Sequence, residues 1–367
     1  MLRQWRRQGL SAIIFDMRLV LGVDAGGTSS RAALFTIEGA PVARGHSGGA
    51  NPGTLGLDQA SANLTTAVGA ALVGVAPSQV EAVVVGLAGH PESCAKLVER
   101  VVGDLLPGTL AQAVGDIVTA FAAGTAEDSG TVLISGTGAI AAKITNHCAS
   151  ATADGYGWQL GDEGSAFWLG RAAARATIRA LNTTAAPASD PPVTGATANS
   201  TADAGAAGCA ASGGGLVGMV VRHLVPEGLG EDPVSQLAAA VYARPPLALA
   251  ELAPLVSRAA SDGDPPALSI VAAAASRLAR TVAEVYEPGL PIVLAGSVLT
   301  TDGPIREAVR QAIRETVGAT PEATVPDGAG LVVAGDVAGA AAWLAARPFL
   351  SRRESRARHP RFVHPSG

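Results

Sequence analysis

The chain has 367 residues, which is enough for two domains with separate hydrophobic cores. Hydrophobic residues make up 48% of it and aromatic residues only 4%, a balance that favours helices packed on parallel or mixed sheets over a β-sandwich. The net charge of -5 gives no electrostatic reason to expect a nucleic acid as partner.

The cysteines and the apolar runs exclude further classes of protein. Cys94, Cys148 and Cys209 are far apart and form no C-x-x-C pair, so neither a zinc knuckle nor a disulfide framework is indicated. No apolar run approaches the ~18 residues that a membrane helix needs. Residues 1–18 combine arginines with a short apolar patch but show no cleavage site, so we interpret them as a disordered extension. We therefore expect a cytoplasmic protein with no membrane partner.

The first half of the chain alternates strands and helices. β-branched and apolar runs predict strands, and Ala-rich or amphipathic runs predict helices. The expected strands cover 19–24, 31–37, 42–46, 81–87 and 110–114, and the expected helices cover 57–73 and 91–105.

The same pattern starts again near residue 131. Strands are expected at 131–135 and 139–144 around a Gly-Thr-Gly turn, then at 291–294, with helices at 304–317 and 336–346. A strand, a glycine turn and a second strand thus occur twice, at 19–37 and 131–144. Residues 183–215 hold almost no large apolar side chain and predict a mobile loop. The arginine-rich stretch 348–367 predicts a solvated basic tail.

The turn Asp24-Ala25-Gly26-Gly27-Thr28-Ser29 is the first candidate for phosphate binding. Gly26 and Gly27 let backbone N–H groups approach an anion, and Thr28 and Ser29 add hydroxyl donors. The carboxylate of Asp24 suits this position if Mg²⁺ lies between it and the phosphate. A plain hairpin turn would use the same residue types, so this turn alone leaves both interpretations open.

Two further glycine corners favour the nucleotide interpretation. The turn Gly136-Thr137-Gly138 could hold a triphosphate from the opposite side, and Gly296-Ser297 offers backbone against which a flat purine could lie. A Walker A loop needs Gly-Lys-Ser/Thr, and neither Lys96 nor Lys143 follows a glycine, which excludes a P-loop NTPase.

Taken together, these motifs resemble the acetate-kinase/hexokinase/actin superfamily, and within it the N-acetylglucosamine kinase-like BadF/BadG/BcrA/BcrD ATPase family. The matching segments are Asp24–Thr28, Gly115-Asp116, Ser135–Gly138 and the run 155–166, whose G-x-G-x-x-x-G-D-E-G-S-A string is the most specific. The resemblance covers roughly 19–346 and implies an α/β, two-domain actin/hexokinase-like (ribonuclease H-like) fold with an interdomain cleft. It implies a small domain of 19–117 plus 336–347 and a large domain of 118–335.

The resemblance also implies a role for each matching residue. Asp116 corresponds to the catalytic aspartate that accepts the proton of the sugar 6-hydroxyl, and a helix N-cap is its bland alternative. Asp24, together with Asp116, corresponds to the site of Mg²⁺. The positions that correspond to ATP contacts are Gly26, Gly27, Thr28, Ser29, Gly136, Thr137, Gly138, Gly296 and Ser297. The positions that correspond to sugar contacts are Asn51, Asp116, Thr137, Gly155, Asp162 and Glu163, although Asp162 and Glu163 could instead cap the helix that begins at Ser165.

The expected activity is transfer of the γ-phosphate of MgATP to O6 of glucosamine. Glucosamine is preferred because the chain most resembles actinobacterial glucosamine kinases; N-acetylglucosamine is the alternative substrate. An activator ATPase for radical dehydratases would need a closely spaced cysteine set, which the chain lacks. A catalytically inactive sugar sensor would not need both Asp24 and Asp116. The oligomeric state stays open, with a homodimer as one option.

Overall fold

The structure is a computed structural model that describes residues 17–185, 215–318 and 330–365. The predicted extension at 1–18 and the predicted mobile loop at 183–215 fall largely outside these residues, as does Cys209. Of the other cysteines, Cys94 is buried and Cys148 is exposed, and both are free thiols.

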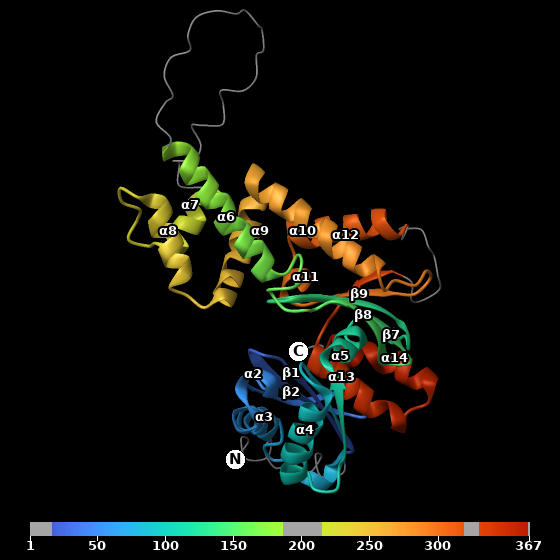
Figure 1. The fold of residues 1–367 in the computed structure, drawn as a ribbon. Helices are drawn as coiled ribbons and strands as arrows, with labels where there is room; N and C mark the ends of the chain where they lie inside the picture. Colours follow the sequence, from blue (N-terminus) through green and yellow to red (C-terminus); the bar gives the residue numbers. More distant parts are fainter. Residues whose placement is uncertain (1–16, 186–214, 319–329, 366–367) are drawn as a thin grey trace, which may run out of the picture.

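The described strands form two five-stranded sheets with the same plan (Figure 1). In each, three consecutive strands form an antiparallel meander, and two later strands add in parallel beside the first of the three. The first sheet has the order β3-β2-β1-β4-β5, and the second has the order β10-β9-β6-β7-β8. The strand–turn–strand unit that occurs twice in the sequence is therefore the start of each sheet.

The strands of the first sheet are β1 (Leu19–Ala25), β2 (Ser29–Thr36), β3 (Pro41–Gly48), β4 (Val80–Leu87) and β5 (Leu110–Gly115). Those of the second sheet are β6 (Gly130–Ser135), β7 (Ala139–Thr145), β8 (Cys148–Asp154), β9 (Ile292–Ala295) and β10 (Leu331–Val333). The predicted strands lie within these elements or overlap them, and β8 and β10 were not predicted.

The helices near the first sheet are α2 (Pro52–Leu55), α3 (Leu57–Ala71), α4 (Pro91–Leu105), α5 (Asp116–Ala122), α13 (Val337–Ala346) and α14 (Arg352–Val363). Those of the second half are α6 (Ala166–Ala185), α7 (Leu216–Leu224), α8 (Pro233–Tyr242), α9 (Ala253–Ser261), α10 (Pro265–Ala283), α11 (Ser297–Thr300) and α12 (Pro304–Val317). Short 3-10 turns cover Pro77–Gln79, Pro246–Leu252 and Arg347–Phe349.

Side chains alternate between the two faces of each strand, and this divides the core into three clusters. Leu19 and Leu21 of β1 face α3 and α4, whereas Val20 faces α5 and α13. In the second sheet, Leu133 faces the helices of the second half, whereas Val132 faces the same middle cluster as Val20. The two sheets therefore share this middle cluster, and α5 and α13 lie between the sheets (Figure 1).

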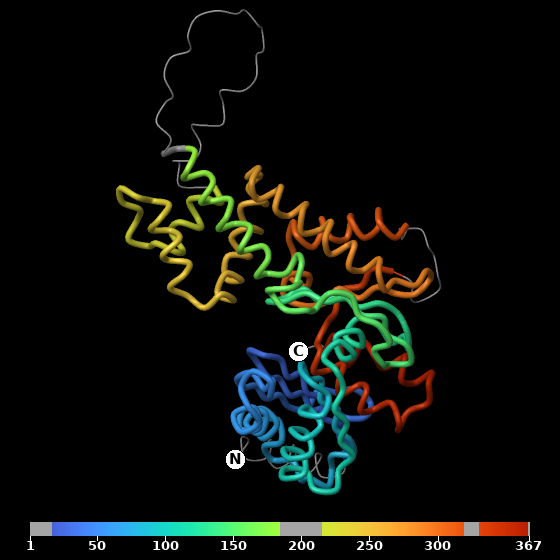
Figure 2. The backbone as a smooth tube through the Cα atoms, in the orientation of Figure 1, coloured from blue at the N-terminus to red at the C-terminus, as the bar shows by residue number. Residues whose placement is uncertain are grey.

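The chain passes between the halves at two places, through α5 and again just before α13 (Figure 2). The approach of α13 to β1 depends on Gly22, because a Cβ at that position would overlap the backbone carbonyl of Ala338. The run of small residues in α13 thus packs directly on a glycine of the central strand.

The prediction of a solvated basic tail is wrong for the described part of 348–367. Residues 352–363 form α14, in which Phe362 is fully buried and rests 5.0 Å from the ring of Phe35. Ser351 caps this helix and forms a capping box with Glu354. The arginines occupy the outer face, and their number hid the spacing of Ser355, His359 and Phe362, which line the buried face.

No helix among the described residues is both long and apolar enough to cross a membrane.

Candidate active site

The candidate site lies where parallel strands of each sheet end, since such strands present their carboxyl ends at one edge. β1 and β5 end at Ala25 and Gly115, so the first glycine turn and Asp116 leave the same edge of the first sheet. β6 and β9 end at Ser135 and Ala295, so the second glycine turn and Gly296 leave one edge of the second sheet.

The first turn, between β1 and β2, is closed by a hydrogen bond of 3.0 Å from the Gly26 amide to the Ser29 carbonyl. A loop supports it from behind: the Ala50 amide donates to the Gly26 carbonyl at 3.0 Å, and a Cβ at Gly49 would overlap the Gly27 carbonyl. No neighbouring atom lies within 4 Å of where a Gly27 Cβ would stand, and Gly27 and Thr28 are exposed. The turn is thus held rigidly and leaves its outer backbone open to an anion.

Asp24 precedes this turn and is half-buried. Burial raises the pKa of its carboxyl group to about 6, and the charges of Asp116 and Asp336 add to the effect. Arg31, its partner on β2, opposes the rise but does not cancel it. Among the described residues no cation forms an ion pair with Asp24.

Asp116 is the first residue of α5 and follows Gly115, which is the N-cap. Its Oδ1 accepts a hydrogen bond of 3.0 Å from the Ile117 amide, which fixes the carboxylate at the positive end of the helix. Burial nevertheless raises its pKa, and the Ile117 N–H only partly counters that rise. Asp116 is therefore not the N-cap of α5, which was the alternative interpretation of this residue, although the start of the helix does position its side chain.

The residues fit the divalent cation that the sequence predicts at Asp24 and Asp116. Two half-buried carboxylates repel each other's charge here, and no described cation forms an ion pair with either. A bound Mg²⁺ would neutralise both, and its usual ligands are such carboxylates together with water and phosphate oxygens.

The second turn, between β6 and β7, is tied to the start of α6. The Gly136 amide donates to the Gly138 carbonyl at 2.9 Å, while the Gly136 carbonyl accepts from the Ala166 amide at 2.8 Å. Gly296 packs against it so closely that a Cβ there would overlap the Ser135 carbonyl, and its φ of 83° also requires glycine. Gly136 and Ser297 are near neighbours, since a Cβ at Gly136 would lie 3.9 Å from the Ser297 Oγ. The structure therefore brings Gly136, Gly296 and Ser297 together.

A pocket of about 400 Å³ opens beside Ser297, and most of its wall comes from α9, α11 and α12. Its polar lining includes Arg258, Ser261, Thr301, Asp302 and Arg306. A purine nucleoside placed against the Gly296-Ser297 corner would enter this pocket. The sequence analysis did not identify Arg258 and Ser261 as lining residues, because they lie on α9, in a part of the chain where no helix was predicted.

Asp162 and Glu163 do not cap α6. Ser165 does so instead, because its Oγ accepts from the Trp168 amide at 3.1 Å. Asp162 is 8% exposed, and its Oδ1 accepts from the Ala139 amide at 3.1 Å beside Gly138. Burial raises its pKa. Glu163 forms an ion pair of 2.7 Å with Arg277 of α10. Asp162 thus fastens its loop to the second turn.

Asp154 is a residue that the sequence analysis missed. It has a positive φ of 61°, and its carboxylate accepts from the amides of Gly155, Asp162 and Glu163 at 2.8, 2.7 and 2.9 Å. It therefore closes the loop that contains three of the predicted sugar contacts. The only signal was an Asp-Gly pair, which is common at ordinary turns.

Asn51 caps α2, with its Oδ1 accepting from the Gly53 amide at 2.8 Å. Among the described residues no hydrogen bond or ion pair joins the first glycine turn to the second, or Asn51 to the loop of Asp162. The structure thus forms separate groups of predicted residues on the two sheets, and Asp24 and Asp116 are the pair that it couples electrostatically.

Most of the chain matches the model of a known protein family. The model of the BadF/BadG/BcrA/BcrD ATPase family matches residues 21–340. The chain belongs to this family. The match covers both sheets and every predicted site residue. No curated protein matches the chain.

Solved structures share the fold. A candidate N-acetylglucosamine kinase from Chromobacterium violaceum has a TM-score of 0.60 at 23% identity, covering 89% of this chain and 99% of its own. Another from Porphyromonas gingivalis also has a TM-score of 0.60, at 21% identity, with 95% and 100% covered. A ROK family glucokinase from Streptomyces griseus, solved with glucose and AMPPNP, has a TM-score of 0.50 at 18% identity, with 90% and 99% covered. The chain therefore has the predicted two-domain actin/hexokinase-like fold.

Proposed function

We propose that this family ATPase is a sugar kinase that transfers the γ-phosphoryl group of MgATP to O6 of glucosamine. The observation that carries the proposal is the pair of half-buried carboxylates, Asp24 and Asp116, at the ends of strands of one sheet, neither of which forms an ion pair with a described cation. Such a pair could bind a metal ion through one carboxylate and accept a proton on the other.

Asp116 is the proposed general base. The O6–H bond breaks, the proton moves to the Asp116 carboxylate, O6 bonds to the γ-phosphorus, and the bond from that phosphorus to the bridging oxygen breaks to release ADP. Burial supports this role, because a carboxylate with a raised pKa holds a proton better than an exposed one does. Mg²⁺ at Asp24, when bound, would neutralise charge on the phosphates.

The donor would extend from the first glycine turn to the second, with its nucleoside in the pocket beside Ser297. The exposed backbone of Gly27 supports phosphate binding, and the pocket of about 400 Å³ supports nucleoside binding. Thr137 and Gly138 belong to the same turn as Gly136 and would face the transferred phosphate.

The sugar would bind to Asn51, Thr137, Gly155, Asp162 and Glu163. The Asn51 Oδ1 is used by Gly53, so its amide nitrogen is the group that remains to contact a hydroxyl. Glu163 is paired with Arg277, which reduces its attraction for an ammonium group. N-acetylglucosamine is therefore kept as the alternative substrate, and the fold relationship to candidate N-acetylglucosamine kinases favours testing it directly.

A coupled assay of ADP release with glucosamine, N-acetylglucosamine and glucose at equal concentrations tests this function. We expect the highest kcat/KM with glucosamine. Asp116→Asn, prepared in parallel as a control for contaminating kinases, should lower kcat by about 10²- to 10⁴-fold. A higher kcat/KM with N-acetylglucosamine would transfer the assignment to that sugar. The absence of sugar-dependent ADP release with all three would refute the kinase proposal.

A further inference from the structure

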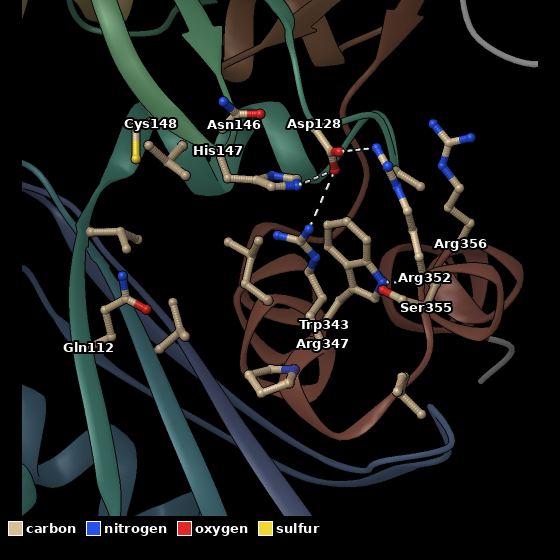
Figure 3. Close-up of a pocket in the computed structure, with 17 residues that line it drawn as sticks. Gln112, Asp128, Asn146, His147, Cys148, Trp343, Arg347, Arg352, Ser355 and Arg356 are labelled. Carbon is tan, nitrogen blue, oxygen red and sulfur yellow. Dashed lines mark hydrogen bonds and ion pairs between the residues drawn. The ribbon is translucent and has the colours of Figure 1, made fainter.

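A second pocket lies on the side of the first sheet that faces α13 and α14 (Figure 3), and no residue of the two glycine turns lines it. Its volume is about 620 Å³. One wall comes from β4, β5 and α5, another from α13, α14 and the turn between them, and a third from the β7–β8 turn. We call it the α13–α14 pocket. None of the predicted site residues lines it.

One side of the α13–α14 pocket is basic. Arg347, Arg352 and Arg356 line it, opposed by Asp128 within it and by Glu127 beside it. Asp128 pairs with Arg347 at 3.4 Å and with Arg352, and Glu127 pairs with Arg356. Each of these ion pairs uses one nitrogen of a guanidinium that carries five N–H donors. Three arginines against two carboxylates leave an excess of positive charge and of donors.

His147 adds a buried polar atom without a partner. Its side chain is 9% exposed, and its Nε2 lies 3.0 Å from Asp128 Oδ1 (Figure 3). Burial acts to raise the pKa of Asp128, but the hydrogen bond from His147 and the charges of Arg352 and Arg347 hold it below the ordinary value, so the carboxylate only accepts and Nε2 donates. Burial and the charge of Arg347 lower the pKa of His147, so the ring is neutral and Nδ1 is an acceptor. No described residue donates to Nδ1.

Apolar side chains also line the pocket: Val84, Val114 and Val118 belong to the wall of β4, β5 and α5, and Trp343 of α13 lies beside Arg347. A ligand in this pocket would meet cationic donors at one end, an acceptor for a hydroxyl at His147, and aliphatic carbon along its length. These three properties of the pocket do not suit a simple hydrophobic ligand. They suit an anion with a hydroxylated carbon body.

We propose that the α13–α14 pocket binds a phosphomonoester of a small polyhydroxylated molecule, with the phosphate at Arg352 and Arg356 and a hydroxyl near His147. The ligand would also touch Val118, two residues after Asp116 in α5, and Trp343 of α13, the helix packed on β1. Its binding therefore involves the two helices that lie between the sheets.

Calorimetric titration of the full chain with inorganic phosphate, glucose 6-phosphate and glucose tests this site without any need for turnover. The variant is Arg352→Gln with Arg356→Gln; these side chains are 77% and 45% exposed, so their loss leaves the core intact. The matched control is Arg353→Gln, an exposed arginine of the same helix that does not line the pocket.

We expect glucose 6-phosphate to bind the wild type and the control equally and the double variant at least about tenfold more weakly, because charge-assisted hydrogen bonds to phosphate are lost. Glucose 6-phosphate should bind more tightly than either inorganic phosphate or glucose, because the phosphate and the hydroxylated body both contribute. Equal binding of inorganic phosphate would contradict the hydroxylated body. Equal affinity of wild type and double variant for glucose 6-phosphate, or no saturable binding by the wild type, would overturn the proposal. Failure of the kinase assay would leave this result unchanged, since both substitutions lie outside the glycine turns.

Discussion

Replacing Asp24 by Asn should stabilise the metal-free protein at neutral pH. In the folded protein the pKa of Asp24 rises from its ordinary 3.8 to about 6, mainly through burial. At about 1.4 kcal/mol per pKa unit, the ionised carboxylate costs the folded state about 3 kcal/mol. Asn has the same shape and no charge, so Asp24→Asn should recover at most this amount, less the cost of burying the amide.

The pH dependence gives this prediction its sign. Below pH 3.8 the carboxyl group is protonated in both states, so it affects the free energy of unfolding equally in the two proteins. Between 3.8 and about 6 the unfolded chain releases the proton and the folded chain keeps it, so the wild type loses stability as the pH rises. Above about 6 the full cost is present, and the advantage of the variant should be constant.

Urea unfolding at several pH values between 4 and 8, followed by circular dichroism with EDTA present, measures this difference. Glu99→Gln is the matched control, since it removes an exposed carboxylate from the middle of α4. Without EDTA, MgATP should stabilise the wild type more than Asp24→Asn, because the variant lacks the proposed metal ligand. An Asp24→Asn protein that is no more stable at pH 7, or whose advantage does not change with pH, would refute the reasoning.

Three other substitutions test the site and the packing. Asp116→Asn should lower kcat by about 10²- to 10⁴-fold while the Kd for ATP, measured by calorimetry, changes little; retention of a tenth of the activity would exclude Asp116 as the base. Gly22→Ala should cost about 3 kcal/mol of unfolding free energy, because its Cβ would overlap α13, whereas Gly69→Ala, with open space around it, should gain a fraction of a kcal/mol; similar effects in urea unfolding would contradict the close packing. Phe362→Ala should cost about 3–5 kcal/mol and lower the Tm, while Arg353→Ala should not; a loss below about 1 kcal/mol would mean that α14 contributes little to the core.

The parts of the fold that were predicted are those in which local sequence and position agree. Leu19–Asp24 and Glu81–Leu87 are apolar runs between turns, and they form the central strands β1 and β4. The turn between β1 and β2 was also predicted directly from its residue types, Gly26 and Gly27. In such segments, the residue types that favour the element are the same ones that the core buries.

The parts that were missed depend on contacts between distant segments. β8 is a mostly exposed edge strand of small residues, so its composition carries no strand signal, and pairing with β7 creates it. The helices α7, α8, α9 and α10, between 216 and 283, were not identified either. Likewise, Glu163 was assigned to the sugar, and the sequence could not show that Arg277 of a distant helix pairs with it.

The helices α13 and α14 have a consequence for how the protein is made. They cover one face of the first sheet, which is encoded some 200 residues or more before them, as β1 ends at Ala25 and α13 begins at Val337. During synthesis, β1, β2 and β4 leave the ribosome before the helices that cover that apolar face, and most of the face stays exposed until α13 and α14 have emerged. Closing so large a loop also makes folding slow. The protein should therefore depend on chaperones during synthesis, although its aromatic content is low. Premature termination before α13 should yield a first half that aggregates.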